Sequence, residues 1–139
     1  MKSKKIWLII VPLVLIALII GGLLMWQNKV KEDKEQALKR NRKYEVSLVK
    51  ALKNSYAGIE EIRITKPNYT YPPGSWSCDV EMLFTDNKKI KYRIGHSLDE
   101  KQNYNGSKTY EQDDFLSSRK GKTTNSIAIH YSDKKKGAQ

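Results

Sequence analysis

Cysteine and histidine are scarce in this chain. Its 139 residues contain one cysteine, Cys78, and two histidines, His96 and His130. A single cysteine excludes an intramolecular disulfide, so a folded domain must be stabilised by a packed core. No Cys/His spacing typical of zinc occurs. The sequence therefore predicts neither a metal site nor a cofactor.

Charge is absent from residues 6–26, which read IWLIIVPLVLIALIIGGLLMW. A helix rises about 1.5 Å per residue, so a run of this length would span the ~30 Å hydrocarbon core of a bilayer. Trp7 and Trp26 lie at its two ends, where indole rings prefer the boundary between lipid and water. We therefore predict a basic head over residues 1–5 and a transmembrane anchor over residues 6–26, with membrane lipid as its partner.

A cleaved secretory signal is the alternative to an anchor. Signal h-regions are about 7–15 residues long and end in small residues, whereas this run is longer and ends in Leu23-Leu24-Met25-Trp26. These features favour an uncleaved single-pass signal anchor. The basic residues after the run favour an intracellular C-terminal portion, but the short lysine-rich head favours the opposite orientation. We expect an extracytoplasmic domain at the cell membrane.

Basic residues outnumber acidic ones, with 26 Lys+Arg against 15 Asp+Glu and a formal net charge of +11. The excess is concentrated between residues 27 and 58 and in Lys134-Lys135-Lys136, while residues 59–132 are close to balance. A basic collar of this kind is attracted to anionic lipid or to an anionic wall polymer. Because the globular part shows no basic stripe and no nucleic-acid motif, we do not expect nucleic acid as a partner.

The apolar periodicity predicts one small α+β domain. Residues 27–58 contain no proline and no glycine before Gly58, and their apolar residues take spacings of three and four, which predicts a juxtamembrane helix. A period of two then predicts strands, and a helix with Thr109 as N-cap is expected between the last two of them. The expected strands cover residues 59–65, 76–85, 90–97 and 126–132, and the helix covers residues 110–120.

The expected element order is α-β-β-β-α-β. It describes a small antiparallel α+β domain over residues 59–132, with its apolar face covered by the N-terminal helix. A basic, disordered tail is expected over residues 133–139.

Asp86-Asn87-Lys88 is expected to form the turn of a hairpin. Apolar residues on both flanking strands have even numbers, so the two sets must face the same side of the sheet. A turn centred on Asn87 then fixes the register. It predicts the pairs Phe84 with Ile90, Met82 with Tyr92, Val80 with Ile94, Cys78 with His96 and Glu81 with Arg93.

Two groups of residues are candidates for function. Cys78 opposite His96 has the residue types of a thiolate–imidazole pair, but a buried cysteine beside a core histidine is the simpler interpretation because no third residue orients the imidazole. The segment from Tyr69 to Trp76 contains two prolines, and Tyr69, Tyr71 and Trp76 offer rigid aromatic surface to a protein or wall component. We therefore predict no catalytic residue and a binding loop.

The layout of basic head, uncharged run, polar helix and small α+β domain resembles uncharacterised small single-pass membrane-anchored proteins of Gram-positive bacteria. The resemblance includes no diagnostic motif, so it assigns a function to no residue of this chain. We expect a membrane-anchored, non-catalytic binding module at the cell surface, for example an immunity or regulatory protein. The alternatives are an accessory subunit of a membrane complex and, less favoured, a thiol-dependent hydrolase.

Overall fold

The computed structural model describes residues 2–103, 106 and 108–139. Within the first helix, side chains are described for residues 13–23 and from residue 33 onward. The chain divides into two compact units, Met1–Leu38 and Lys39–Gln139. The first unit is the N-terminal part of helix α1 (Lys2–Ser55), and the second contains the rest of α1, a sheet and a second helix.

The predicted transmembrane anchor over residues 6–26 is wrong. Among the residues that the structure describes, no helix is both long and apolar enough to cross a membrane. The predictions of a membrane protein, of a single-pass chain and of a signal anchor depended on this anchor, and they are wrong for the same reason. The side chains of residues 6–12 and 24–26 lie outside the described ones.

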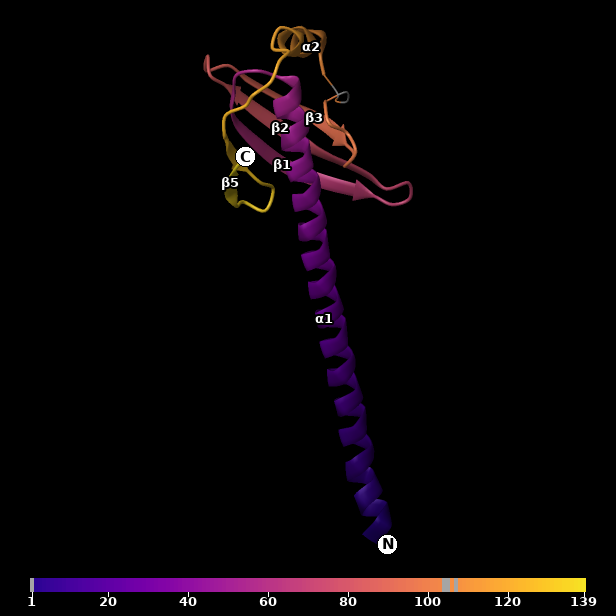
Figure 1. The fold of residues 1–139 in the computed structure, drawn as a ribbon. Helices are drawn as coiled ribbons and strands as arrows, with labels where there is room; N and C mark the ends of the chain where they lie inside the picture. The colour runs from indigo at the N-terminus through magenta and orange to yellow at the C-terminus, as the bar shows by residue number, and fades with distance from the viewer. Residues whose placement is uncertain (1, 104–105, 107) are drawn as a thin grey trace. The chain divides into compact units, whose positions relative to one another are not determined.

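The sheet has five strands in the order β3-β2-β1-β4-β5. Strands β1, β2 and β3 form an antiparallel meander, β4 pairs parallel to β1, and β5 pairs antiparallel to β4. The bounds are β1 (Ile59–Thr70), β2 (Ser75–Phe84), β3 (Lys89–His96), β4 (Ala128–His130) and β5 (Lys136–Ala138). Figure 1 shows the C-terminal part of α1 crossing this sheet.

The expected order α-β-β-β-α-β and the expected antiparallel sheet are therefore wrong, although the domain is α+β. The chain returns from its second helix to the free edge of β1 and enters in the same direction as β1, which makes the sheet mixed. A turn with Lys134 at φ 67° then sends residues 136–138 back along β4. The fifth strand thus occupies the segment for which we expected a disordered tail.

The β2–β3 register differs by two residues from the expected one. The observed pairs include Cys78 with Ile94, Val80 with Tyr92, Met82 with Ile90 and Asp79 with Arg93. The turn is centred on Asp86 instead of Asn87, because Phe84 N donates to Lys88 O and Asn87 N donates to Phe84 O while Asn87 adopts φ 67°. Asparagine tolerates this left-handed conformation better than most residues. The predicted face was correct, since a shift of two preserves side-chain parity.

The core lies between α1 and one face of the sheet. The helix contributes Leu48, Val49 and Leu52, and all three are fully buried. The even-numbered residues of β2 and β3 face them, as predicted; they are Trp76, Cys78, Val80, Met82, Phe84, Ile90, Tyr92, Ile94 and His96. The other face of the sheet is therefore uncovered by α1.

The second helix, α2 (Tyr110–Ser117), begins where expected. Thr109 caps it, since Gln112 N donates to the Thr109 hydroxyl and Thr109 N donates to the Gln112 side chain. This reciprocal capping box satisfies two backbone donors at the start of the helix. The helix ends before the expected boundary at Lys120, because Arg119 and Gly121 form backbone hydrogen bonds with Ala57 and Ser55 at the end of α1.

Leu48→Ala should destabilise the folded chain by about 2–5 kcal/mol, because it removes a fully buried side chain and leaves a cavity. The matched control is Leu38→Ala, since Leu38 is on the same helix but is 53% exposed. Urea unfolding followed by tryptophan fluorescence would measure both. Equal midpoints for the two variants would contradict the packing of α1 on the sheet.

Candidate functional site

Tyr69 and Trp76 lie where β1 and β2 approach their connecting turn, and both side chains contact α1. Trp76 is 2% exposed. Its indole Nε1 donates to Asn41 Oδ1 at 3.1 Å, and its ring stacks on Tyr44 with centroids 5.3 Å apart. Tyr69 also contacts Tyr44, at 6.2 Å. These two predicted binding residues therefore hold the end of the hairpin against the helix.

Tyr71 behaves differently from its two aromatic neighbours. It lies in the turn between β1 and β2, and 82% of its surface is exposed. Gly74 closes the same turn with φ 83°, and a Cβ placed on it would lie 3.1 Å from the Tyr69 hydroxyl. The structure thus brings Tyr69 and Trp76 together as a support and presents Tyr71 to solvent.

Arg40 completes the aromatic support from the helix side. Its guanidinium carbon lies 4.4 Å from the centroid of the Tyr69 ring, within the range of a cation–π interaction. Three neighbouring residues of α1, at positions 40, 41 and 44, therefore contact the hairpin. The hairpin end is fixed by side-chain packing in addition to its backbone ladder.

The open face of the sheet is charged, and the carboxylates of Asp79 and Glu61 lie deeper than the lysine and arginine side chains that pair with them. Arg93 bonds Asp79 at 3.0 Å, and the side chains of Lys66 and Asp79, 4.0 Å apart, are 78% and 19% exposed. Glu61, at 28% exposed, pairs in the same way with Arg63, at 54% exposed, over 3.6 Å. It also contacts His130, which is 22% exposed. The outermost charges of the pairs that Asp79 and Glu61 form with lysine and arginine are consequently basic.

The expected pair of Cys78 and His96 does not exist. Cys78 faces Ile94 across the strands, and His96 faces Trp76. Cys78 is fully buried, and desolvation by burial raises the pKa of its thiol far above the ordinary value. Because the thiolate is the nucleophilic form of cysteine, this environment opposes thiol chemistry at neutral pH.

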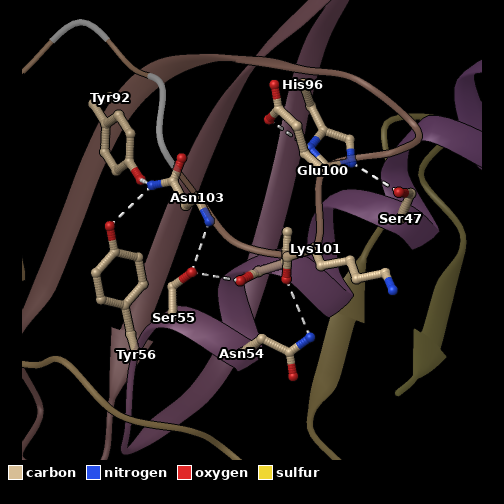
Figure 2. Close-up of polar contacts among 10 residues, drawn as sticks. Ser47, Asn54, Ser55, Tyr56, Tyr92, His96, Glu100, Lys101 and Asn103 are labelled. Carbon is tan, nitrogen blue, oxygen red and sulfur yellow. Dashed lines mark hydrogen bonds and ion pairs between the residues drawn. The ribbon is translucent and has the colours of Figure 1, made fainter.

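His96 instead joins two residues that the sequence analysis missed, Ser47 on α1 and Glu100 in the loop after β3 (Figure 2). The Ser47 hydroxyl lies 2.8 Å from His96 Nε2. On the other side of the ring, Nδ1 lies 3.7 Å from Glu100 Oε2. The order serine, histidine, carboxylate is that of a hydrolase triad.

The surroundings of His96 oppose its use as a general base. Its side chain is 1% exposed, and desolvation by burial lowers its pKa to about 4, although Asp99 acts in the opposite direction. A general base works best when its pKa lies near the operating pH. The distance to Glu100 also exceeds that of a hydrogen bond. We interpret the three residues as a contact that fixes the end of β3 to α1.

The sequence did contain a signal for Ser47. It lies three residues after Tyr44 and four before Ala51, which places its hydroxyl on the buried stripe of the helix. A hydroxyl on this stripe is partly withdrawn from water and needs a hydrogen-bond partner, and the half-buried Ser47 hydroxyl finds that partner in His96. Glu100 gave no comparable signal, because it lies in a loop.

The part of the chain that the structure describes contains no group of three or more His, Cys, Asp or Glu side chains that could hold a metal ion. Comparison with known proteins returned no match to the chain among family models, curated proteins or solved structures.

The free energy of unfolding should fall as the pH decreases from about 6.5 to about 4. His96 titrates near 6.5 in the unfolded chain and near 4 in the folded one, so the unfolded state binds more protons between these values and is favoured there. The loss attributable to His96 is roughly 2–3 kcal/mol at pH 4. Urea unfolding at pH 7.5 and pH 4 would measure it.

His96→Gln is the control for this titration. Glutamine keeps a polar group near Ser47 but does not titrate, whereas the acidic residues contribute to the pH dependence of both chains. The variant should be less stable than the parent at pH 7.5 and should lose less stability on acidification. Identical losses in the two chains would contradict the role assigned to His96.

Proposed function

We propose that residues 39–139 form a non-catalytic module that binds a partner protein through the Tyr71 end of the β1–β2 hairpin. The observation that carries the proposal is the contrast between Tyr71, at 82% exposed, and Trp76, at 2% exposed, within one hairpin. Tyrosine is enriched at the energetic centres of protein interfaces. A large aromatic ring displayed on a fixed support is suited to that role.

Rigidity of the support favours binding through this hairpin end. Tyr69 and Trp76 are held by Arg40, Asn41 and Tyr44 of α1. Ordering a mobile loop on association costs free energy, and a loop that is already ordered avoids part of that cost. Tyr71 is attached directly to this ordered segment.

The open sheet face provides polar groups along the same hairpin. Arg93 donates to the Ser77 hydroxyl at 3.0 Å, to Asp79 and to the carbonyl of Lys66. These contacts leave the Lys66 side chain outermost, at 78% exposed. An aromatic residue accompanied by solvated polar groups matches the core and rim of a typical interface.

A non-catalytic role agrees with the environments of Cys78 and His96. The thiol-dependent hydrolase would need a thiolate, and burial raises the pKa of Cys78. A serine hydrolase using Ser47 would need His96 as base, and burial lowers its pKa to about 4. A thiol with a raised pKa stays protonated at neutral pH, and an imidazole with a pKa of about 4 is a weak base there.

Site-specific photo-crosslinking tests the proposal. A benzophenone amino acid placed at position 71 should yield a discrete covalent adduct with one protein on irradiation of the producing cells. Tyr110 is the matched control position, because it is an exposed tyrosine, at 93%, in a different part of the fold. Adducts of the same mass and yield from both positions would overturn the assignment.

The purified partner then permits a quantitative test. Tyr71→Ala should weaken its binding by at least about tenfold, or about 1.4 kcal/mol, and Tyr110→Ala should leave the affinity unchanged. Both residues are exposed, so neither substitution should change the free energy of unfolding by more than about 0.5 kcal/mol. Unchanged affinity for a folded Tyr71→Ala variant would refute the role of the hairpin end.

A further inference from the structure

A pocket of about 490 Å³ lies at the C-terminal end of α1. Its walls come from three segments that are distant in the sequence: the end of α1, the loop after β3 and the segment after α2. The lining residues are Asn54, Ser55, Tyr56, Gln102, Asn103, Lys120, Gly121 and Lys122. The volume falls within the range of about 300–1,000 Å³ that is usual for small-molecule sites.

The wall formed by residues 120–122 is held close to α1 by backbone contacts. Gly121 N donates to Ser55 O at 3.1 Å, and Ala57 N donates to Arg119 O at 2.8 Å. A Cβ placed on Gly121 would lie 2.9 Å from the Ala57 Cβ, which is closer than side chains normally approach. Glycine is therefore required at this point of the wall.

The opposite wall is fixed by Asn103 (Figure 2). Its side-chain amide donates to the hydroxyls of Tyr56, at 2.9 Å, and Tyr92, at 3.1 Å, and its backbone N donates to the Ser55 hydroxyl at 2.7 Å. The Asn54 amide donates to the carbonyl of Lys101 at 3.2 Å. These bonds shape the pocket before any ligand enters.

The charge of the pocket selects the sign of its ligand. Lys120 and Lys122 are exposed at the rim, and the described residues that line the pocket include no aspartate or glutamate. Within the described part of the chain, neither lysine forms an ion pair. Two ammonium groups without a carboxylate between them attract an anion, and lysine is a common ligand of phosphate.

Two side chains of the lining keep hydrogen-bonding capacity beyond the bonds that shape the pocket. Among the bonds of the described residues, the Asn54 amide uses one N–H for Lys101 O, which leaves its second N–H and its carbonyl oxygen. The Ser55 hydroxyl donates to Ala51 O and accepts from Asn103 N, which leaves one acceptor site. Amides and hydroxyls both donate and accept hydrogen bonds, as the hydroxyls of a sugar or polyol require. We propose that this pocket binds a small polyhydroxylated anion, namely a monosaccharide or polyol that carries one phosphate group.

Titration of the full-length chain with glucose 6-phosphate tests the site, with glucose and inorganic phosphate as separate probes. Backbone amide resonances of residues 54–56 and 120–122 should shift and saturate with glucose 6-phosphate. The dissociation constant should lie at or below about 1 mM and should be at least about tenfold lower than for either separate probe. Glucose tests recognition of the hydroxyls alone, and inorganic phosphate tests recognition of the anion alone.

Lys120→Ala/Lys122→Ala should weaken binding of glucose 6-phosphate by at least about tenfold, because it removes both rim charges. Lys134→Ala/Lys135→Ala is the charge-matched control, since both lysines are exposed in the turn before β5. Circular dichroism would verify that each variant is folded.

Three outcomes would overturn the proposal. The first is the absence of saturable shifts at these residues up to 10 mM, taken as an upper limit of about tenfold above the expected constant. The second is equal affinity for glucose 6-phosphate and inorganic phosphate, since the hydroxyls would then contribute nothing. The third is equal weakening by the two double-lysine variants, which would indicate attraction to the net charge instead of binding in the pocket.

Discussion

The packing of α1 on one face of the sheet is the constraint on which the rest of the domain depends. Leu48, Val49 and Leu52 are fully buried against the even-numbered residues of β2 and β3. Removal of this apolar surface from water is the main favourable term in folding. Because side chains alternate across a strand, burial of one set leaves the odd-numbered set on the open face. The charged surface of the domain is thus a consequence of the core.

The same helix positions both candidate binding regions. Residues 40, 41 and 44 hold the β1–β2 hairpin, and Ser47 holds the end of β3. Ser55, together with Tyr56 just past the end of the helix, holds the loop at the pocket. The helix also fixes the end of the sheet: Glu45, buried at 1% exposure, accepts a hydrogen bond from Ser132 N at 2.7 Å. Each contact joins segments distant in the sequence, so displacement of α1 would affect all of them.

Burial separates the reactive residue types of this domain from solvent. Cys78 and His96 belong to the core, where the low dielectric disfavours both thiolate and imidazolium. Tyr71, Lys120 and Lys122 lie at the surface, where they remain accessible to partners. The division explains why a triad-like sequence of Ser47, His96 and Glu100 reads better as a structural contact, while accessible groups carry the proposed binding.

The sequence by itself determined the local features of this protein. Alternation in β2 and β3 identified the buried face, and Thr109 identified the start of α2, because both depend on neighbours within a few residues. Tertiary structure decided the features set by distant contacts: the parallel pairing of β4, the incorporation of residues 136–138 as β5, and the partner of His96. The pocket could not be predicted for the same reason, since its walls meet only when the loop after β3 and residues 120–122 pack against the end of α1.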